Sequence, residues 1–340
     1  MNNPFVSVII PNYNHARFLN ERIQSVLNQT YQDFELIILD DKSSDNSKDV
    51  IELYRNNPHV THIIYNEQNS GSTFKQWEKG INLAKGEYVW LAESDDSCQK
   101  TLLEKLVAQI KQNANVSVAF VHSLTFDQDG NILGGLRPIV HPKIWDGKAF
   151  IKKKMCMGNT IDNASMAVFS RRKALEIGNT YQLYIGAGDY LFWIMMAEKG
   201  NVAEVSEPLN LCRIHTNKVT NRREKDGSNT KARKGIFDYL NEKGYVSPKQ
   251  RAVIYAQNRN LINILCSELN IGEKHKLLSL WDMDDKEANT ILKREDLRNK
   301  IKTIILVVSH LFFYLKKSVI KLLYKSDKKE LSQILYRFNS

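Results

Sequence analysis

Three carboxylates lie within four residues, in the segment Glu93-Ser94-Asp95-Asp96. The segment directly follows Tyr88–Ala92, an apolar run typical of a buried strand. Neighbouring carboxylates repel one another and burial raises that cost, so such a cluster is stable where a cation neutralises it. A divalent metal suits this place because hard cations bind several carboxylate oxygens. A solvated acidic turn is the alternative, but the carboxyl end of a strand favours a ligand site.

Polar groups also follow the other apolar runs of the first half of the chain. They are Asn12-Tyr13-Asn14, Asp40-Asp41 and the segment 66–69. No GxGxxG follows the first run and no GxxxxGK[ST] occurs, which disfavours dinucleotide binding and P-loop hydrolysis. A carboxylate can accept the N–H of a nucleobase, a tyrosine can contact its ring, and a metal can hold a diphosphate without a glycine cradle. The pattern therefore indicates a metal-bridged nucleotide-diphosphate ligand.

The elements that must position these groups alternate along the chain. Apolar runs at 5–10, 34–39, 60–65 and 88–92 predict strands, and amphipathic segments between them predict helices. Short connections between them indicate βαβ units and a parallel sheet. Further along, the sequence predicts strands at 116–121, 164–169, 202–205 and 209–214, and helices at 143–157 and 189–198.

The last third of the chain differs in charge and pattern. Residues 1–230 hold equal numbers of basic and acidic side chains, so the formal net charge of +10 lies in 231–340. Residues 216–235 predict a linker, and 297–323 predict an amphipathic helix with basic residues off its apolar face. Its uninterrupted apolar stretch has 13 residues, fewer than the roughly 20 that span a bilayer. An interfacial helix and a helix packed in a bundle both fit.

The charge asymmetry predicts an anionic partner, either membrane headgroups or nucleic acid. Nucleic acid is disfavoured because the tail lacks exposed aromatic residues between its basic ones. Four widely spaced cysteines without a CxxC pair indicate a reducing compartment, and the first residues lack the pattern of a secretory signal. We therefore expect a cytoplasmic location.

The ordered series VSVIIPNYN, LIILDDKSSDNS and YVWLAESDD resembles the inverting family 2 glycosyltransferases of the GT-A fold. The resemblance covers residues 4–125 well and 158–220 more loosely. It implies an α/β fold, with a mostly parallel, Rossmann-like sheet flanked by helices and an all-helical C-terminal appendage. The domains would be a GT-A domain at 1–220, a linker at 221–235 and a basic helical region at 236–340.

The same resemblance implies roles for particular residues. Those expected to bind the nucleotide are Pro11, Tyr13, Asp40, Asp41, Lys75, Gln76 and Asp95. Asp96 would be the principal ligand of Mn²⁺ or Mg²⁺, with Asp95 beside it and His215 approaching the metal or the diphosphate. Arg213 is a further candidate for phosphate contact. Glu93 departs from the family, which often has Asp there.

Asp189 begins an apolar helix after a glycine-rich turn, which a helix N-terminus alone would explain. An inverting transfer, however, needs a base that accepts the proton of the acceptor hydroxyl. The resemblance places the catalytic Asp here, often after a Glu that is Gly188 in this chain. We therefore expect Asp189 to be the general base.

Together these features predict a metal-dependent inverting glycosyltransferase. It would move a sugar from a nucleotide-diphosphate donor to a hydroxyl of a saccharide, expected to be lipid-linked, in surface polysaccharide synthesis. The basic helices would hold it on the inner face of the plasma membrane. A nucleotidyltransferase is one alternative, but PNYNHARF is not the glycine-rich basic loop that such an enzyme carries after its first strand. A non-catalytic membrane-associated scaffold is the other.

Overall fold

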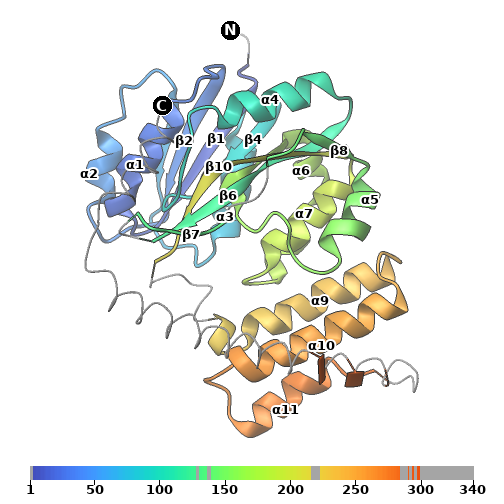
Figure 1. The fold of residues 1–340 in the computed structure, drawn as a ribbon. Coiled ribbons are helices and arrows are strands. Elements are labelled where there is room, and N and C mark those ends of the chain that lie inside the picture. The colour runs from blue at the N-terminus through green and yellow to red at the C-terminus, as the bar shows by residue number, and fades with distance from the viewer. Residues whose placement is uncertain are drawn as a thin grey trace, which may run out of the picture.

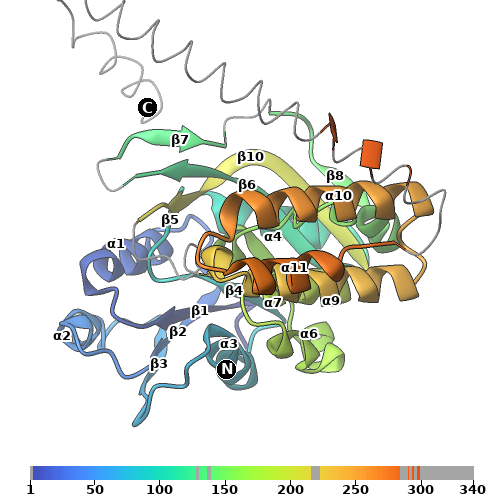
Figure 2. The same ribbon diagram turned by 90° about the horizontal axis from the view of Figure 1, so that it is seen from below.

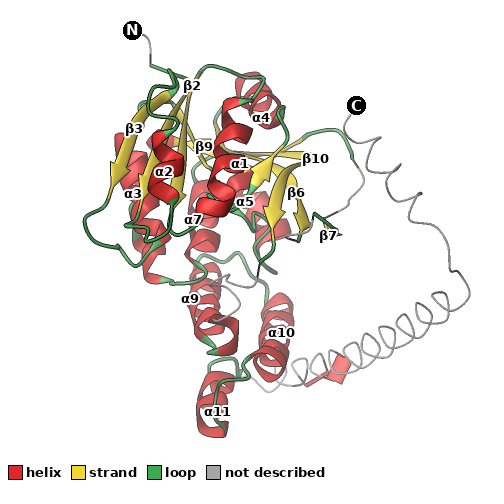
Figure 3. Cartoon of the chain, turned by 90° about the vertical axis from the view of Figure 1, so that its left-hand side faces the viewer, coloured by secondary structure: helices red, strands yellow, loops and turns green. Residues whose placement is uncertain are grey.

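The computed structural model describes residues 3–127, 130–135, 139–215 and 223–283, together with 290, 293–294 and 297–298 (Figure 1). Its centre is a mixed sheet in the order β3-β2-β1-β4-β9-β6-β10-β5, with β7 paired to β6 and β8 paired to β10. Helices cover the sheet, and three C-terminal helices lie together at one end of the molecule (Figures 1 and 3).

The first half of the sheet is the predicted parallel unit. Its strands are β1 (Val6–Asn12), β2 (Phe34–Asp40), β3 (Val60–Tyr65) and β4 (Tyr88–Leu91). The helices between them are α1 (Ala16–Leu27), α2 (Ser47–Glu52) and α3 (Thr73–Leu83). Every residue of β1, β2 and β4 is buried, because helices cover both faces. Since β1 pairs in parallel with β2 and β4, the polar residues after these strands meet at one edge.

The second half of the sheet mixes directions. Its longer strands are β6 (Val116–Phe126), β9 (Ala167–Ser170) and β10 (Asn201–Arg213), and its short ones are β5 (Ser97–Cys98) and β7 (Ile132–Gly134). β9 runs antiparallel to β4 and β6, whereas β10 runs parallel to β6. The strands expected at 202–205 and 209–214 are one continuous strand, β10, whose register against β6 shifts between Val205 and Asn210.

Further helices complete this half. They are α4 (Leu102–Gln112), α6 (Arg171–Ile177), α7 (Gly188–Glu198) and the 3₁₀ turns η2 (Ala164–Met166) and η3 (Thr180–Leu183). The predicted helix at 189–198 is thus α7. Eight of its eleven residues are buried, as expected of a helix that is apolar on all sides.

The single helix predicted at 143–157 is wrong. The chain instead forms β8 (Lys143–Trp145), α5 (Gly147–Phe150) and the π-helix η1 (Ile151–Met155). Pairing of Trp145 with Val202 takes the first residues into the sheet. Asp146 then starts α5 by accepting a hydrogen bond from the N–H of Ala149.

The C-terminal helices are α9 (Ser228–Glu242), α10 (Pro248–Leu265) and α11 (Ile271–Ser279). The view from below shows them beside α7 (Figure 2). α9 begins inside the stretch expected to be a linker, where Asn229 and Thr230 are buried, and it buries Ile236, Phe237 and Leu240 beyond that stretch. The amphipathic helix expected at 297–323 falls almost wholly outside the described residues. Within the described residues, no helix has the length and apolar character needed to cross a bilayer.

Candidate active site

Asp41 is the centre of a hydrogen-bonded cradle at the end of β2. Its carboxylate accepts from Asn66 Nδ2 (2.6 Å), Gln76 Nε2 (3.0 Å) and both the backbone N–H and the hydroxyl of Ser70 (2.9 and 2.7 Å). The Oε1 atom of Gln76 is buried and has no hydrogen-bond partner. The structure therefore places Gln76 directly against Asp41.

Other residues expected at the nucleotide lie at the same edge. Asp40 is buried and accepts from Asn12 Nδ2 (2.8 Å), while Pro11 is buried within β1. Tyr13 is 49% exposed, which leaves its ring available to a ligand. Lys75 is exposed and its Nζ reaches the carbonyl oxygen of Ser70 (3.2 Å), at the rim of the Asp41 cradle. Their roles in binding stay predictions.

A second group forms where the ends of β1, β4 and β10 meet. His15, Asp95 and His215 place one possible ligand atom each within 4.8 Å of one another. His215 Nε2 lies 3.0 Å from Asp95 Oδ2, and the two imidazole rings are 5.7 Å apart, edge to face. Burial lowers the pKa of His15, which favours its neutral, metal-binding form.

These three side chains fit a divalent cation. Each imidazole offers a ring nitrogen and Asp95 a carboxylate oxygen, and Nε2 of His215 faces that carboxylate. Ser94 Oγ lies 2.8 Å from Nδ1 of His15 and fixes that ring. Two imidazoles with one carboxylate favour a transition metal over Mg²⁺, which prefers oxygen ligands. His15 is not among the residues expected from the sequence, although it directly follows the polar turn after β1.

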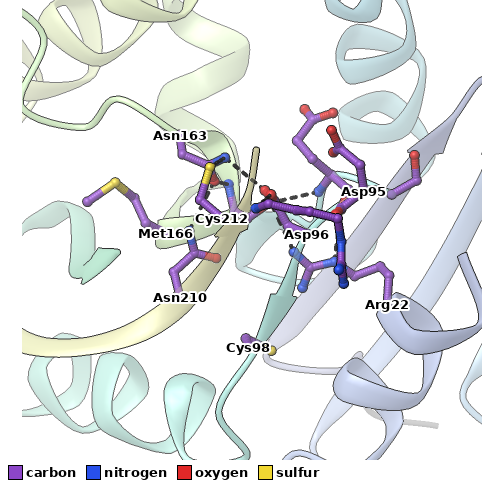
Figure 4. Close-up of polar contacts among 12 residues, drawn as sticks. Arg22, Asp95, Asp96, Cys98, Asn163, Met166, Asn210 and Cys212 are labelled. Carbon is purple, nitrogen blue, oxygen red and sulfur yellow. Dashed lines mark hydrogen bonds and ion pairs between the residues drawn. The ribbon is translucent and has the colours of Figure 1, made fainter. Parts of the chain in front are cut away.

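Asp96, expected as the principal metal ligand, is not part of this group. It is 1% exposed, and its carboxylate accepts from Asn163 Nδ2 (2.8 Å), Ser165 Oγ (2.8 Å) and the backbone N–H of Arg213 (3.1 Å) (Figure 4). The guanidinium of Arg22, fully buried, lies 4.0 Å away. The protein itself thus provides a cation and three donors for Asp96, while Asp95 faces the histidines.

Arg213 and Glu93 border this group. Arg213 donates to the carbonyl oxygen of Asp95 (3.1 Å) and to Glu21 (2.6 Å), so the protein already uses its guanidinium. Burial, with the nearby charges of Asp95 and Asp96, raises the pKa of Glu93 to about 8. Its Oε1 accepts from Trp77 Nε1 (2.9 Å), which accounts for the longer side chain at this position.

Asp189 lies in the first turn of α7. Its Oδ2 accepts from Asn159 Nδ2 (2.9 Å). Burial raises its pKa to about 7, although hydrogen bonds from backbone N–H groups at the helix start oppose the rise. A Cβ at Gly188 would lie 2.4 Å from the carbonyl oxygen of Tyr181, so the Glu that often precedes the family's Asp has no room here.

The fold is that of GT-A proteins. The structure resembles the mannosyltransferase PcManGT from Pyrobaculum calidifontis, with a TM-score of 0.54 and 13% identity, over 88% of this chain and 89% of that one. It also resembles TarS 1-349 of S. aureus, with a TM-score of 0.50 and 18% identity, over 81% of this chain and 71% of that one.

The chain belongs to Glycosyl transferase family 2, which it matches over residues 7–178. It is 34% identical over 130 residues to the putative teichuronic acid biosynthesis glycosyltransferase TuaG of Bacillus subtilis, and 33% identical over 127 residues to the glycosyltransferase GlyG of Streptococcus pneumoniae. These matches cover 38% and 37% of this chain, but only 51% and 42% of the relatives' length. The resemblance and the enzyme class predicted from the sequence are confirmed.

Proposed function

We propose that this glycosyltransferase is metal-dependent and inverting, and that it transfers a sugar from a nucleotide-diphosphate donor to a saccharide hydroxyl. One observation carries the proposal: the His15–Asp95–His215 group lies at the same sheet edge as the Asp41 cradle. A nucleoside on the cradle would direct its diphosphate toward that group. The neighbour PcManGT is described with GDP-Man and Mn²⁺, and TarS with UDP-GlcNAc, which supports such a donor.

In this proposal the cradle binds the nucleobase. Asp41 accepts a base N–H, and the unpartnered Oε1 of Gln76 accepts a second donor of the ligand. Tyr13 covers the base, and Lys75 at the cradle's rim approaches the phosphates. The other proposed members of this site are Pro11 and Asp40.

Asp95 and His215, together with His15, would hold Mn²⁺. When bound, the cation neutralises charge that develops on the departing nucleoside diphosphate. Asp96 supports the acidic turn from behind, through the contacts that hold it against Asn163 and Ser165. In this proposal, Asp95 binds the cation, whereas the adjacent Asp96 holds the turn in place.

Asp189 would be the general base. Inversion is a single in-line displacement, so one group must remove the proton of the acceptor hydroxyl as the sugar leaves the donor. A carboxylate with a pKa of about 7 suits this because it is largely ionised above neutral pH and is a stronger base than an ordinary Asp. Asn159 Nδ2 donates a hydrogen bond to one of the two carboxylate oxygens of Asp189, Oδ2.

We also propose a lipid-linked saccharide acceptor at the inner face of the plasma membrane, with residues 1–220 catalytic and the helical region after them attached to the membrane. The basic excess of residues 231–340 supports this, as does the similarity to a protein named for teichuronic acid biosynthesis. Co-sedimentation of the full chain with anionic and with zwitterionic vesicles tests it. Absence of binding to the anionic vesicles contradicts it.

Release of nucleoside diphosphate from UDP-GlcNAc and GDP-mannose, with Mn²⁺ or with EDTA, tests the catalytic proposal. We expect Asp95→Ala to abolish the thermal stabilisation by Mn²⁺ plus nucleoside diphosphate. Asp189→Asn should keep that stabilisation but lower kcat by about 10²–10⁴-fold. Asp49→Ala on exposed α2 is the control and should change neither.

Full turnover in EDTA would exclude the metal, and full turnover of Asp189→Asn would exclude this base. The reaction product separates the nucleotidyltransferase alternative. A nucleotidyltransferase, given a nucleoside triphosphate and a sugar 1-phosphate, would release pyrophosphate, whereas a sugar transferase releases the nucleoside diphosphate from the nucleotide sugar.

A further inference from the structure

The segment from Gly158 to Ser165 contains two asparagines with the same local geometry. In each, the side-chain oxygen accepts the backbone N–H two residues further on: Asn159 from Ile161 (3.2 Å) and Asn163 from Ser165 (2.8 Å). This is an Asx turn. Because each oxygen binds an N–H of its own segment, each Nδ2 must point away from the turn toward another partner.

Asn159 directs its Nδ2 at the proposed base, 2.9 Å from Asp189 Oδ2. A donor on one carboxylate oxygen helps to fix the plane of the group. It also favours the charged form of Asp189, because a hydrogen bond to a carboxylate lowers its pKa. The charge of Asp162, on the same segment, acts in the opposite direction.

Asn163 directs its Nδ2 at the acidic turn, 2.8 Å from Asp96 Oδ2 (Figure 4). Asn210 Nδ2 also donates to the side-chain oxygen of Asn163 (3.2 Å), which fixes the same orientation of the amide. Ser165, at the end of the segment, donates to Asp96 (2.8 Å) and accepts the backbone N–H of Glu93 (3.0 Å). This end of the segment therefore holds the turn that carries Asp95.

The body of the segment is anchored between these two ends. Ile161 and Ala164 are buried, at 1% and 6% exposure. The hydroxyl of Thr160 donates to the carbonyl oxygen of Lys154 (2.7 Å), and the hydroxyl of Tyr190 donates to that of Met155. Tyr190 is the residue after Asp189, so the start of α7 contacts the segment through Asn159 and the preceding helix η1 through Met155.

We propose that residues 158–165 form a positioning segment that fixes the position of the base, Asp189, relative to the metal-binding turn that carries Asp95. Asn159 and Asn163 are its two contact points. The inference rests on the proposed roles of Asp189 and Asp95. Neither asparagine need touch the substrate. Asn159 orients Asp189 for the acceptor hydroxyl, and Asn163 keeps the acidic turn, and with it Asp95, at a fixed distance from the base.

Steady-state kinetics of the full chain with Mn²⁺ and a turned-over nucleotide sugar test this. We expect Asn159→Ala to lower kcat about tenfold or more, with little change in donor KM, because misplacing a base affects the chemical step. The acidic limb of its kcat–pH profile should move to higher pH, since the charged form of Asp189 loses a donor. Asn159→Asp keeps the Asx turn but brings a second negative charge, and should move the limb further.

Asn163→Ala should affect metal binding rather than the base. It should raise the Mn²⁺ concentration for half-maximal activity by about 10- to 100-fold, the usual effect of losing a group that supports a metal ligand. Asn57→Ala is the matched control, because Asn57 forms the same turn with the N–H of His59 (3.0 Å) at the start of β3, away from the site. It should lower Tm by a similar amount and leave kcat, the pH profile and the Mn²⁺ requirement unchanged.

The outcomes separate this inference from the proposed function. If Asp189→Asn retains turnover, the base is elsewhere and the proposed function fails. If Asp189→Asn is inactive but both Asn159 variants behave like Asn57→Ala, with the pH limb in place, the positioning segment is wrong. An Asn163→Ala variant with an unchanged Mn²⁺ requirement overturns the second contact.

Discussion

Two adjacent carboxylates, Asp95 and Asp96, acquire different environments in this fold. Asp96 points into the protein, where three donors and the buried guanidinium of Arg22 surround it. Asp95 faces two imidazoles. Residue type and spacing alone cannot distinguish the two, because the strand end before them does not fix which carboxylate turns inward. The contacts from β10 and η2 make that choice.

At the residue scale, the raised pKa of Asp189 should make it a better base but should lower the stability of the folded chain at neutral pH. Its pKa is about 7 in the folded chain and near 3.8 in the unfolded one, so the folded state binds the proton more tightly. Stability therefore falls as pH rises from about 4 to about 7, and the penalty is complete above that range. Asp189→Asn removes the penalty.

We expect the Tm of Asp189→Asn, relative to the wild type, to rise between pH 5 and pH 8 while activity is lost. Differential scanning calorimetry at the two pH values measures this. Asp33→Asn, at an exposed carboxylate before β2, is the control and should show no such pH-dependent gain. An equal Tm difference at both pH values would mean that Asp189 titrates normally.

At the element scale, the start of α7 depends on Gly188. A Cβ at this position would lie 2.4 Å from the carbonyl oxygen of Tyr181 and 2.7 Å from the ring of Phe74. Gly188→Ala should therefore displace the first turn of α7, lowering both Tm and kcat, with a loss of stability of about 1–3 kcal/mol. Thermal melts and turnover measure the two effects.

Gly272→Ala is the matched control for that change. Gly272 lies in the first turn of α11, where the nearest atom to a new Cβ is 3.5 Å away. Alanine there should raise stability by up to about 1 kcal/mol, because it restricts the unfolded chain. A Gly188→Ala variant as stable and active as this control would show that α7 tolerates the side chain.

The elements of the first half follow closely from the sequence. Val60–Tyr65, for example, is the predicted strand to the residue, because local apolar runs bounded by polar turns determine such βαβ units. The helix expected at 143–157 does not form as a single element because the pairing partner of its first residues, β10, lies about sixty residues further along the chain. His15 was missed for a related reason: only the sheet order, with β1 next to β4, brings it to Asp95.

At the scale of the whole molecule, Glu198 joins α7 to the C-terminal helices. It accepts hydrogen bonds from the hydroxyls of Tyr239 (2.6 Å) and Tyr245 (3.0 Å). Burial, together with the Glu198 carboxylate, raises the pKa of Tyr245 to about 12. The rings of Tyr190 and Phe237 pack edge to face nearby, with 6.3 Å between their centroids, so apolar contact accompanies the polar one.

Glu198→Ala should destabilise the chain by about 1–3 kcal/mol, because it leaves two partly buried hydroxyls without their acceptor. Urea denaturation measures this change. Glu176→Ala is the control, since Glu176 forms only exposed ion pairs with Arg172 and Lys199 and should change stability by less than about 1 kcal/mol. Equal urea midpoints for the two variants would mean that the hydroxyls of Tyr239 and Tyr245 form hydrogen bonds with water in place of Glu198.

One helix, α7, therefore carries Asp189 at its first turn and Glu198 at its last residue. A helix turns about 100° per residue, so these two side chains project on roughly opposite sides of the same rod. Inserting or deleting a single residue between them would rotate one end of the helix by about 100° relative to the other. Either Asp189 would then move out of the site, or Glu198 would lose its hydrogen bonds with the tyrosines. Relatives that share both contacts should thus keep this helix constant in length, whereas those lacking α9 are free to vary it.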